Sequence, residues 1–112
     1  MSAAPPAPAT VTGRYRVNST FSGGFIGEVR VSNVSGSAQG WEVRLEFSGG
    51  RVTRAWVMNA VQGEPSEDDN PYTYRSGVDL APGASARLMF VAEGADTHPV
   101  ACSVNGVTCA GL

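Results

Sequence analysis

The sequence predicts an all-β domain, an antiparallel sandwich of many short strands. Residues 41–47 alternate strictly between apolar and polar side chains, which is the period of a half-buried strand. No window carries apolar residues at helical spacing over three turns. Fourteen Gly and seven Pro supply frequent turn signals. A length of 112 residues suits one domain with one hydrophobic core.

The expected strands follow the apolar pattern along the chain. They are residues 10–17, 25–32, 40–47, 51–57, 71–75 and 85–91, followed by a hairpin over 102–109. Residues 35–40, rich in Ser and Gly, are interpreted as the loop that returns the strand at 40–47 antiparallel to the strand at 25–32. In the strand at 85–91, Leu88 and Phe90 are predicted to face the core.

The two tryptophans differ in how clearly their environment can be predicted. Trp41 begins the strict alternation, so it is expected on the buried side. Trp56 shares a row of alternate residues with Val52 and Arg54, and a charge in the middle of that row does not suit a core. Two interpretations of Trp56 stay open, a partly buried strand residue and an exposed binding residue.

Composition and motifs argue against most kinds of chemistry. The net charge is −2, which gives no electrostatic case for nucleic acid or an anionic membrane, and no apolar run has membrane-spanning length. His98 is the single histidine, and the acidic residues 67–69 lack the spacing of a calcium loop. The Gly-Gly pair at 23–24 enters a strand, whereas a phosphate-binding loop enters a helix. We therefore predict no enzyme, no metal and no cofactor.

The cysteines indicate a local disulfide. Cys102 and Cys109 flank Asn105-Gly106, the strongest two-residue hairpin signal in the chain, which sets them opposite each other. We expect a disulfide here and an oxidising, extracellular setting. Residues 1–10 are rich in Ala and Pro and are expected to be a linker or an expression start, with the folded module at 11–112.

Six segments, in this order and spacing, resemble one known family. They are Asn-Ser-Thr-Phe-Ser-Gly-Gly-Phe at 18–25, Val-Arg-Val-Ser-Asn at 29–33, Gly-Trp-Glu-Val-Arg-Leu-Glu-Phe at 40–47, Val-Thr-Arg-Ala-Trp at 52–56, Leu-Ala-Pro-Gly at 80–83 and Val-Asn-Gly-Val-Thr-Cys at 104–109. The chain is similar to the bacterial family 2 carbohydrate-binding modules. The resemblance implies a nine-stranded jelly-roll-like sandwich that binds cellulose, chitin or xylan without catalysis and is attached to a secreted polysaccharide-degrading enzyme.

The resemblance also implies a row of surface aromatic residues. In cellulose-binding members three surface Trp form the row, and the first two positions fall at Phe21 and Trp56 here. The third position falls at Tyr74 when residues are counted forward from Trp56. It falls at Ser76 when they are counted back from the Leu-Ala-Pro-Gly turn. Tyr72, two residues from Tyr74, can take the same face.

Three departures from the family pattern concern the binding face and the disulfide. Two of the three surface Trp are absent. Glu28, Arg54 and Arg87 stand where polar amides usually flank the platform, and we include them among the ligand-binding residues. The family's usual N-terminal Cys is missing, so the disulfide between chain ends is replaced by the hairpin one.

The charged neighbours of the aromatic row leave a second hypothesis open. A face that carries Glu28, Arg54 and Arg87, with an acidic loop at 64–69, also suits a protein-interaction or assembly domain that has lost or changed sugar binding.

Overall fold

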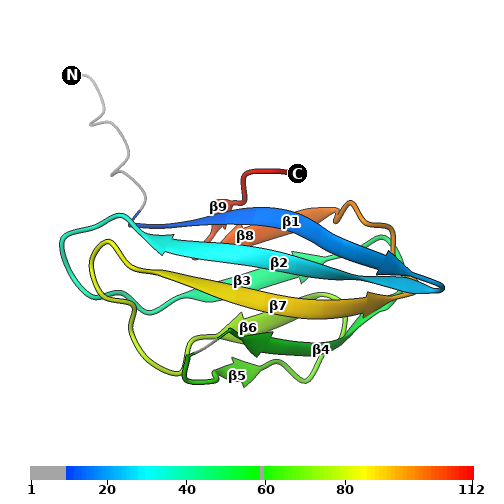
Figure 1. Ribbon diagram of the computed structural model, residues 1–112, viewed down its shortest axis with the longest axis horizontal. Helices are drawn as coiled ribbons and strands as arrows, with labels where there is room; N and C mark the ends of the chain where they lie inside the picture. Colours follow the sequence, from blue (N-terminus) through cyan, green and yellow to red (C-terminus); the bar gives the residue numbers. More distant parts are fainter. Residues whose placement is uncertain (1–9, 59) are drawn as a thin grey trace, which may run out of the picture.

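Two antiparallel sheets face each other across one core in the computed structural model, which describes residues 10–58 and 60–112 (Figure 1). The first sheet has the order β1 (Val11–Phe21), β2 (Gly24–Asn33), β7 (Ser85–Glu93) and β4 (Arg51–Val57). The second has the order β5 (Glu64–Pro65), β6 (Tyr72–Arg75), β3 (Glu42–Glu46), β8 (Ala101–Val104) and β9 (Val107–Thr108). This confirms the predicted nine-stranded sandwich. All of the expected linker except Thr10 lies outside the described residues.

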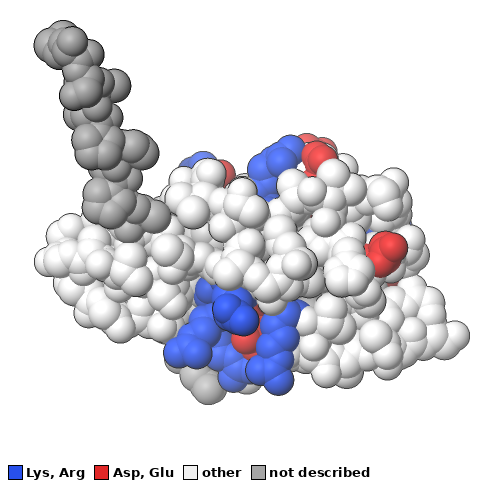
Figure 2. Space-filling model, turned by 90° about the horizontal axis from the view of Figure 1, so that it is seen from above, with Lys and Arg blue, Asp and Glu red and all other residues white. Residues whose placement is uncertain are grey.

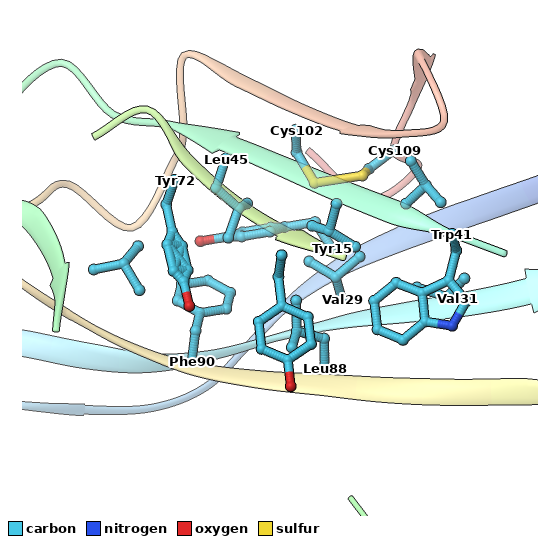
Figure 3. Close-up of a cluster of buried hydrophobic side chains, with 14 of the residues drawn as sticks. Tyr15, Val29, Val31, Trp41, Leu45, Tyr72, Leu88, Phe90, Cys102 and Cys109 are labelled. Carbon is cyan, nitrogen blue, oxygen red and sulfur yellow. A yellow bond between two sulfur atoms is a disulfide. The ribbon is translucent and has the colours of Figure 1, made fainter. Parts of the chain in front are cut away.

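The core is built by the inward-facing residues of both sheets. Val29 and Phe90 are fully buried in the first sheet, and Val43 and Leu45 are 1% exposed in the second. Trp41 is buried as its phase in the strand predicted, with 5% exposure. Figure 3 shows it inside the apolar cluster between the sheets. Alternation thus correctly identified the buried row of side chains that begins at Trp41 and continues through β3.

The predicted partner of that strand was wrong. β2 and β3 lie in different sheets, so residues 35–40 cross from one sheet to the other and do not close a hairpin. Apolar alternation shows which side of a strand is buried, but it does not show which strand lies beside it. The first strand is also longer than expected, because it continues to Phe21 and turns only at Ser22 and Gly23.

The predicted disulfide between Cys102 and Cys109 is present. Asn105 and Gly106 both adopt positive φ, 48° and 80°, as a tight hairpin between β8 and β9 requires. The Asn105 side chain also accepts a hydrogen bond from the Glu42 backbone N–H at 2.8 Å, which ties the hairpin to the start of β3.

Candidate functional site

The outward-pointing side chains of β1, β2, β7 and β4 form the candidate site, which we call the outer face. Strand register and alternation place them on one side of the first sheet, away from the core. Its charged members are Arg14, Arg16, Arg30, Arg51, Arg54, Arg87, Glu28 and Glu93, and its larger apolar members are Phe21, Ile26, Trp56, Met89 and Val91.

A β-bulge decides where Trp56 points. Val52 pairs with Ala92 and Arg54 pairs with Val91, so Thr53 is an extra residue on β4. The extra residue reverses the alternation, which buries Val52 at 3% exposure and turns Arg54 and Trp56 outward. Trp56 is half-buried and lies opposite Met89 on β7. The apparent conflict of an arginine within a core row therefore disappears, because the row changes sides at the bulge.

Arg54 contacts the Trp56 ring. Its guanidinium carbon lies 5.3 Å from the ring centroid, in the range of a cation–π interaction. Arg54 is itself exposed. One face of the indole is therefore partly covered by an exposed charged group that a ligand can displace or contact.

Phe21 lies on the same outer face, at the turn between β1 and β2. It pairs with Gly24 and is 44% exposed. Its ring lies where a side chain at Gly24 would stand, since a Cβ built there comes within 2.8 Å of the Phe21 ring. Glycine at position 24 thus leaves room for the phenyl ring beside the backbone of the hairpin. Phe21 and Trp56 come from the two edge strands of one sheet.

The structure does not bring Tyr74 and Tyr72 to this face, so those two assignments are corrected. Tyr74 is 3% and Tyr72 is 7% exposed, and both belong to β6 of the opposite sheet. They pair with Val43 and Leu45, the buried residues of β3, and therefore share their inward direction. Tyr74 stacks on Trp41 with ring centroids 6.0 Å apart and an interplanar angle of 18°.

Ser76, the other counted position for the third aromatic, is a structural residue. Its hydroxyl oxygen accepts a hydrogen bond from the Trp41 backbone N–H at 3.0 Å. The aromatic row of the outer face is thus reduced to Phe21 and Trp56.

Glu28 and Arg87, both predicted as site residues, form an ion pair on the outer face. Glu28 is only 5% exposed, and Arg87 Nε donates to its Oε1 at 2.9 Å. Burial alone raises the pKa of Glu28. Hydrogen bonds from Arg87 and Asn18, with the charges of Arg87 and Arg16, outweigh burial and hold that pKa below its usual value. Glu28 is therefore a fixed negative charge within a basic surface.

Sequence reasoning missed how many arginines share this face. Six of the chain's eight basic residues point outward from the first sheet, together with two carboxylates, Glu28 and Glu93, which gives strand residues of the outer face a net charge of +4. The whole chain carries −2. Basic side chains gathered around an acidic one are visible at the lower edge of Figure 2. Arg14 and Arg16 occupy alternate positions of one predicted strand, and this spacing was the sequence signal that could have indicated a basic face.

The described residues offer little for other chemistry. Within residues 10–58 and 60–112, no group of three or more His, Cys, Asp or Glu side chains is arranged to hold a metal ion. No helix long and apolar enough to cross a membrane occurs among them.

Comparisons with known proteins agree on one relationship. The chain is 34% identical to the endoglucanase CelA of Streptomyces lividans over 97% of its own length, and it spans about a quarter (25%) of that relative. Its fold matches the chitin-binding domain of Chi18aC from Streptomyces coelicolor with a TM-score of 0.71 and 29% identity, covering 91% of this chain and 96% of that one. It also matches the cellulose-binding family 2 carbohydrate binding domain of ScLPMO10C with a TM-score of 0.61 and 26% identity, covering 88% and 96%.

The family assignment follows from a match along nearly the whole folded region. The family model described as "Cellulose binding domain" covers residues 11–109, which include all nine strands. This chain belongs to the cellulose binding domain family, the family 2 carbohydrate-binding modules.

Proposed function

We propose that the outer face binds β-linked polysaccharide, with cellulose or chitin as the main ligand and xylan as the third, and that it does so without catalysis. The observation that carries the proposal is the bulge at Thr53, which turns Trp56 outward onto the same face as Phe21. A flat aromatic ring offers the apolar C–H face of a pyranose a matching surface.

The energetics of two rings support weak binding. Burying about 100 Å² on each ring at ~25 cal/mol/Å² contributes about 2–3 kcal/mol per ring. Association costs at least about 4 kcal/mol in lost translational and rotational freedom. Two rings therefore exceed this cost only slightly, and neither binds alone. Hydrogen bonds from charged residues such as Arg87 to sugar hydroxyls then determine how tight the complex is.

The relatives support a role as a targeting module. The region similar to this chain is a quarter of an endoglucanase, and a domain of this size can hold that enzyme near an insoluble substrate. The disulfide of the C-terminal hairpin suits secretion into an oxidising environment. We infer that this domain delivers an attached polysaccharide-degrading enzyme outside the cell.

Binding to insoluble cellulose, chitin and xylan tests the proposal. We expect Trp56→Ala and Phe21→Ala each to lower the association constant at least about tenfold on the polysaccharide that binds the parent chain. Val107→Ala, at an exposed apolar residue of β9 in the other sheet, is the control and should bind normally. Circular dichroism and the unfolding midpoint verify that each variant is folded. The proposal fails if the parent chain binds none of the three polysaccharides, or if folded Trp56→Ala binds like the parent.

A further inference from the structure

Three arginines stand side by side across the first sheet. Arg14 pairs with Arg30 on β2, and Arg30 pairs with Arg87 on β7. All three point outward and are exposed. Like charges directly opposite each other on neighbouring strands destabilise a sheet. We call these three residues the arginine row.

The arginine row has more positive charge than its surroundings neutralise. Arg87 is paired with Glu28. Among the described residues, Arg14 and Arg30 have no carboxylate within salt-bridge distance. Arg16 pairs in register with Glu28 and adds a further positive charge beside the row. Two guanidinium groups are thus available to an anion from outside the chain.

Hydroxyl groups lie next to these free guanidinium groups. Thr12 and Ser32 pair in register one outward position beyond Arg14 and Arg30. These four residues, with Gly13 and Ala110, line a shallow surface depression. Guanidinium groups bind carboxylates in a bidentate geometry, and hydroxyls exchange hydrogen bonds with sugar hydroxyls. The depression therefore combines the groups that an acidic sugar needs.

The arginine row is close enough to Trp56 for one ligand chain to contact both. Trp56 belongs to the neighbouring outward row of the sheet, with Met89 and Glu28 as partners across the strands. Neighbouring outward rows are about 7 Å apart along the strands, and neighbouring strands about 4.8 Å apart. An oligosaccharide of several units that stacks on Trp56 can extend across β7 and β2 to Arg30.

We propose that the arginine row is a subsite for the carboxylates of a β-linked polysaccharide that carries acidic sugar units. The inference rests on the proposed function, because the neutral part of the same chain would stack on Trp56. Nucleic acid fits less well than a polysaccharide with scattered acidic units, since Glu28 lies fixed within the basic face and would repel a continuous run of phosphates.

A matched pair of polymers tests the subsite. The same cellulose is used unmodified and after oxidation of its C6 hydroxyls to carboxylates, and binding of the parent chain to both is measured at low and high salt. We expect about five- to tenfold tighter binding to the carboxylated form at low salt, since exposed charge contacts are individually modest and are screened by salt.

Two double variants separate the arginine row from net charge. Arg14→Gln with Arg30→Gln should remove the preference for the carboxylated form, and it should lower binding to that form more than binding to unmodified cellulose. Arg44→Gln with Arg75→Gln lowers the net charge by the same amount on the second sheet, and this control should keep the preference. Both pairs are exposed, and unfolding midpoints verify that the variants are folded.

The possible results distinguish failure of the subsite from failure of the proposed function. Equal binding of the parent chain to both celluloses overturns the subsite and leaves the proposed function intact. An equal loss in the two double variants also overturns it, because net charge would then explain the preference. Equal binding to carboxylated and sulfated cellulose would show a general polyanion surface and overturn it as well. Binding to no polysaccharide at all refutes the proposed function.

Discussion

At the scale of single residues, Arg54 covers part of the Trp56 ring, which we propose as a sugar-stacking surface. Its guanidinium lies 5.3 Å from the ring centroid, and an exposed cation–π contact of this kind contributes about 0.5–1 kcal/mol. A sugar that stacks on the covered face must displace it. We expect Arg54→Ala to strengthen binding to neutral polysaccharide about two- to fivefold, measured as an association constant on unmodified cellulose or chitin.

Arg51→Ala is the matched control for that prediction. Arg51 is an exposed arginine of the same strand, but its register partner is Glu93 and it makes no cation–π contact with Trp56. The control should bind neutral polysaccharide like the parent chain. Weaker binding by Arg54→Ala would instead mean that the guanidinium contacts the sugar directly and does not obstruct it.

Single residues also show where sequence reasoning succeeds and where it stops. Trp41 is buried as predicted, because the alternation around it is uninterrupted. The direction of Trp56 depends on the bulge at Thr53, and no composition or spacing marks that extra residue. Tyr74 was counted onto the binding face from spacing alone, but its direction is set by pairing with Val43. Predicting the arginine row requires the register between β1 and β2, which only the structure supplies.

At the scale of elements, the hairpin of β8 and β9 depends on both its turn and its disulfide. The hairpin is held by β3, which pairs with β8, and by contacts with β1, while β9 lies at the edge of the second sheet. A loop closed by cysteines only seven positions apart restricts the unfolded chain modestly, by about 2–3 kcal/mol on the chain-entropy account.

Chemical unfolding with and without reductant tests this contribution. We expect reduction to lower the free energy of unfolding by about 2–3 kcal/mol, because the unfolded chain then gains conformational freedom. The Cys102→Ala with Cys109→Ala variant is the control, and reductant should not change its midpoint. If the parent chain has one midpoint in both conditions, the disulfide does not contribute to stability.

Strand positions were predicted better than strand partners. The strand predicted at 51–57 coincides with β4, and the tight turn at Asn105-Gly106 forms as expected. By contrast, the loop at 35–40 carries no signal for crossing between sheets. Local pattern and turn chemistry therefore predict elements, while the choice of neighbour depends on contacts distant in the sequence.

At the scale of the whole molecule, charge is distributed unevenly between the surfaces of the sandwich. The strands of the outer face carry six arginines, whereas the remaining two, Arg44 and Arg75, lie on the second sheet and are paired with Glu46 and Glu42. A net charge of −2 conceals this separation. Net charge alone offered no electrostatic case for nucleic acid or an anionic membrane, and that conclusion holds only for the average of the molecule.

The shared core links the stability of the whole sandwich to the protonation of its buried tyrosines. Burial, then the neighbouring Tyr74 and Asp69, raise the pKa of Tyr72 from 10.0 to about 12, and burial followed by the charge of Asp96 raises the pKa of Tyr15. The folded state holds these protons more tightly than the unfolded state does. Their contribution to the free energy of unfolding is therefore fully present below about pH 10 and is lost as the pH rises toward the pKa in the folded state.

We therefore expect the free energy of unfolding to fall between about pH 10 and pH 12, with Tyr72 accounting for a loss on the order of 2 kcal/mol. Denaturant titrations across this range, together with the tyrosinate absorbance, measure both the stability and the ionisation. Tyr72→Phe cannot ionise, so its stability should fall less steeply than that of the parent chain, while the two differ little at pH 7. Identical slopes for the two proteins would show that Tyr72 is not protected by the core, which would contradict its placement between the sheets.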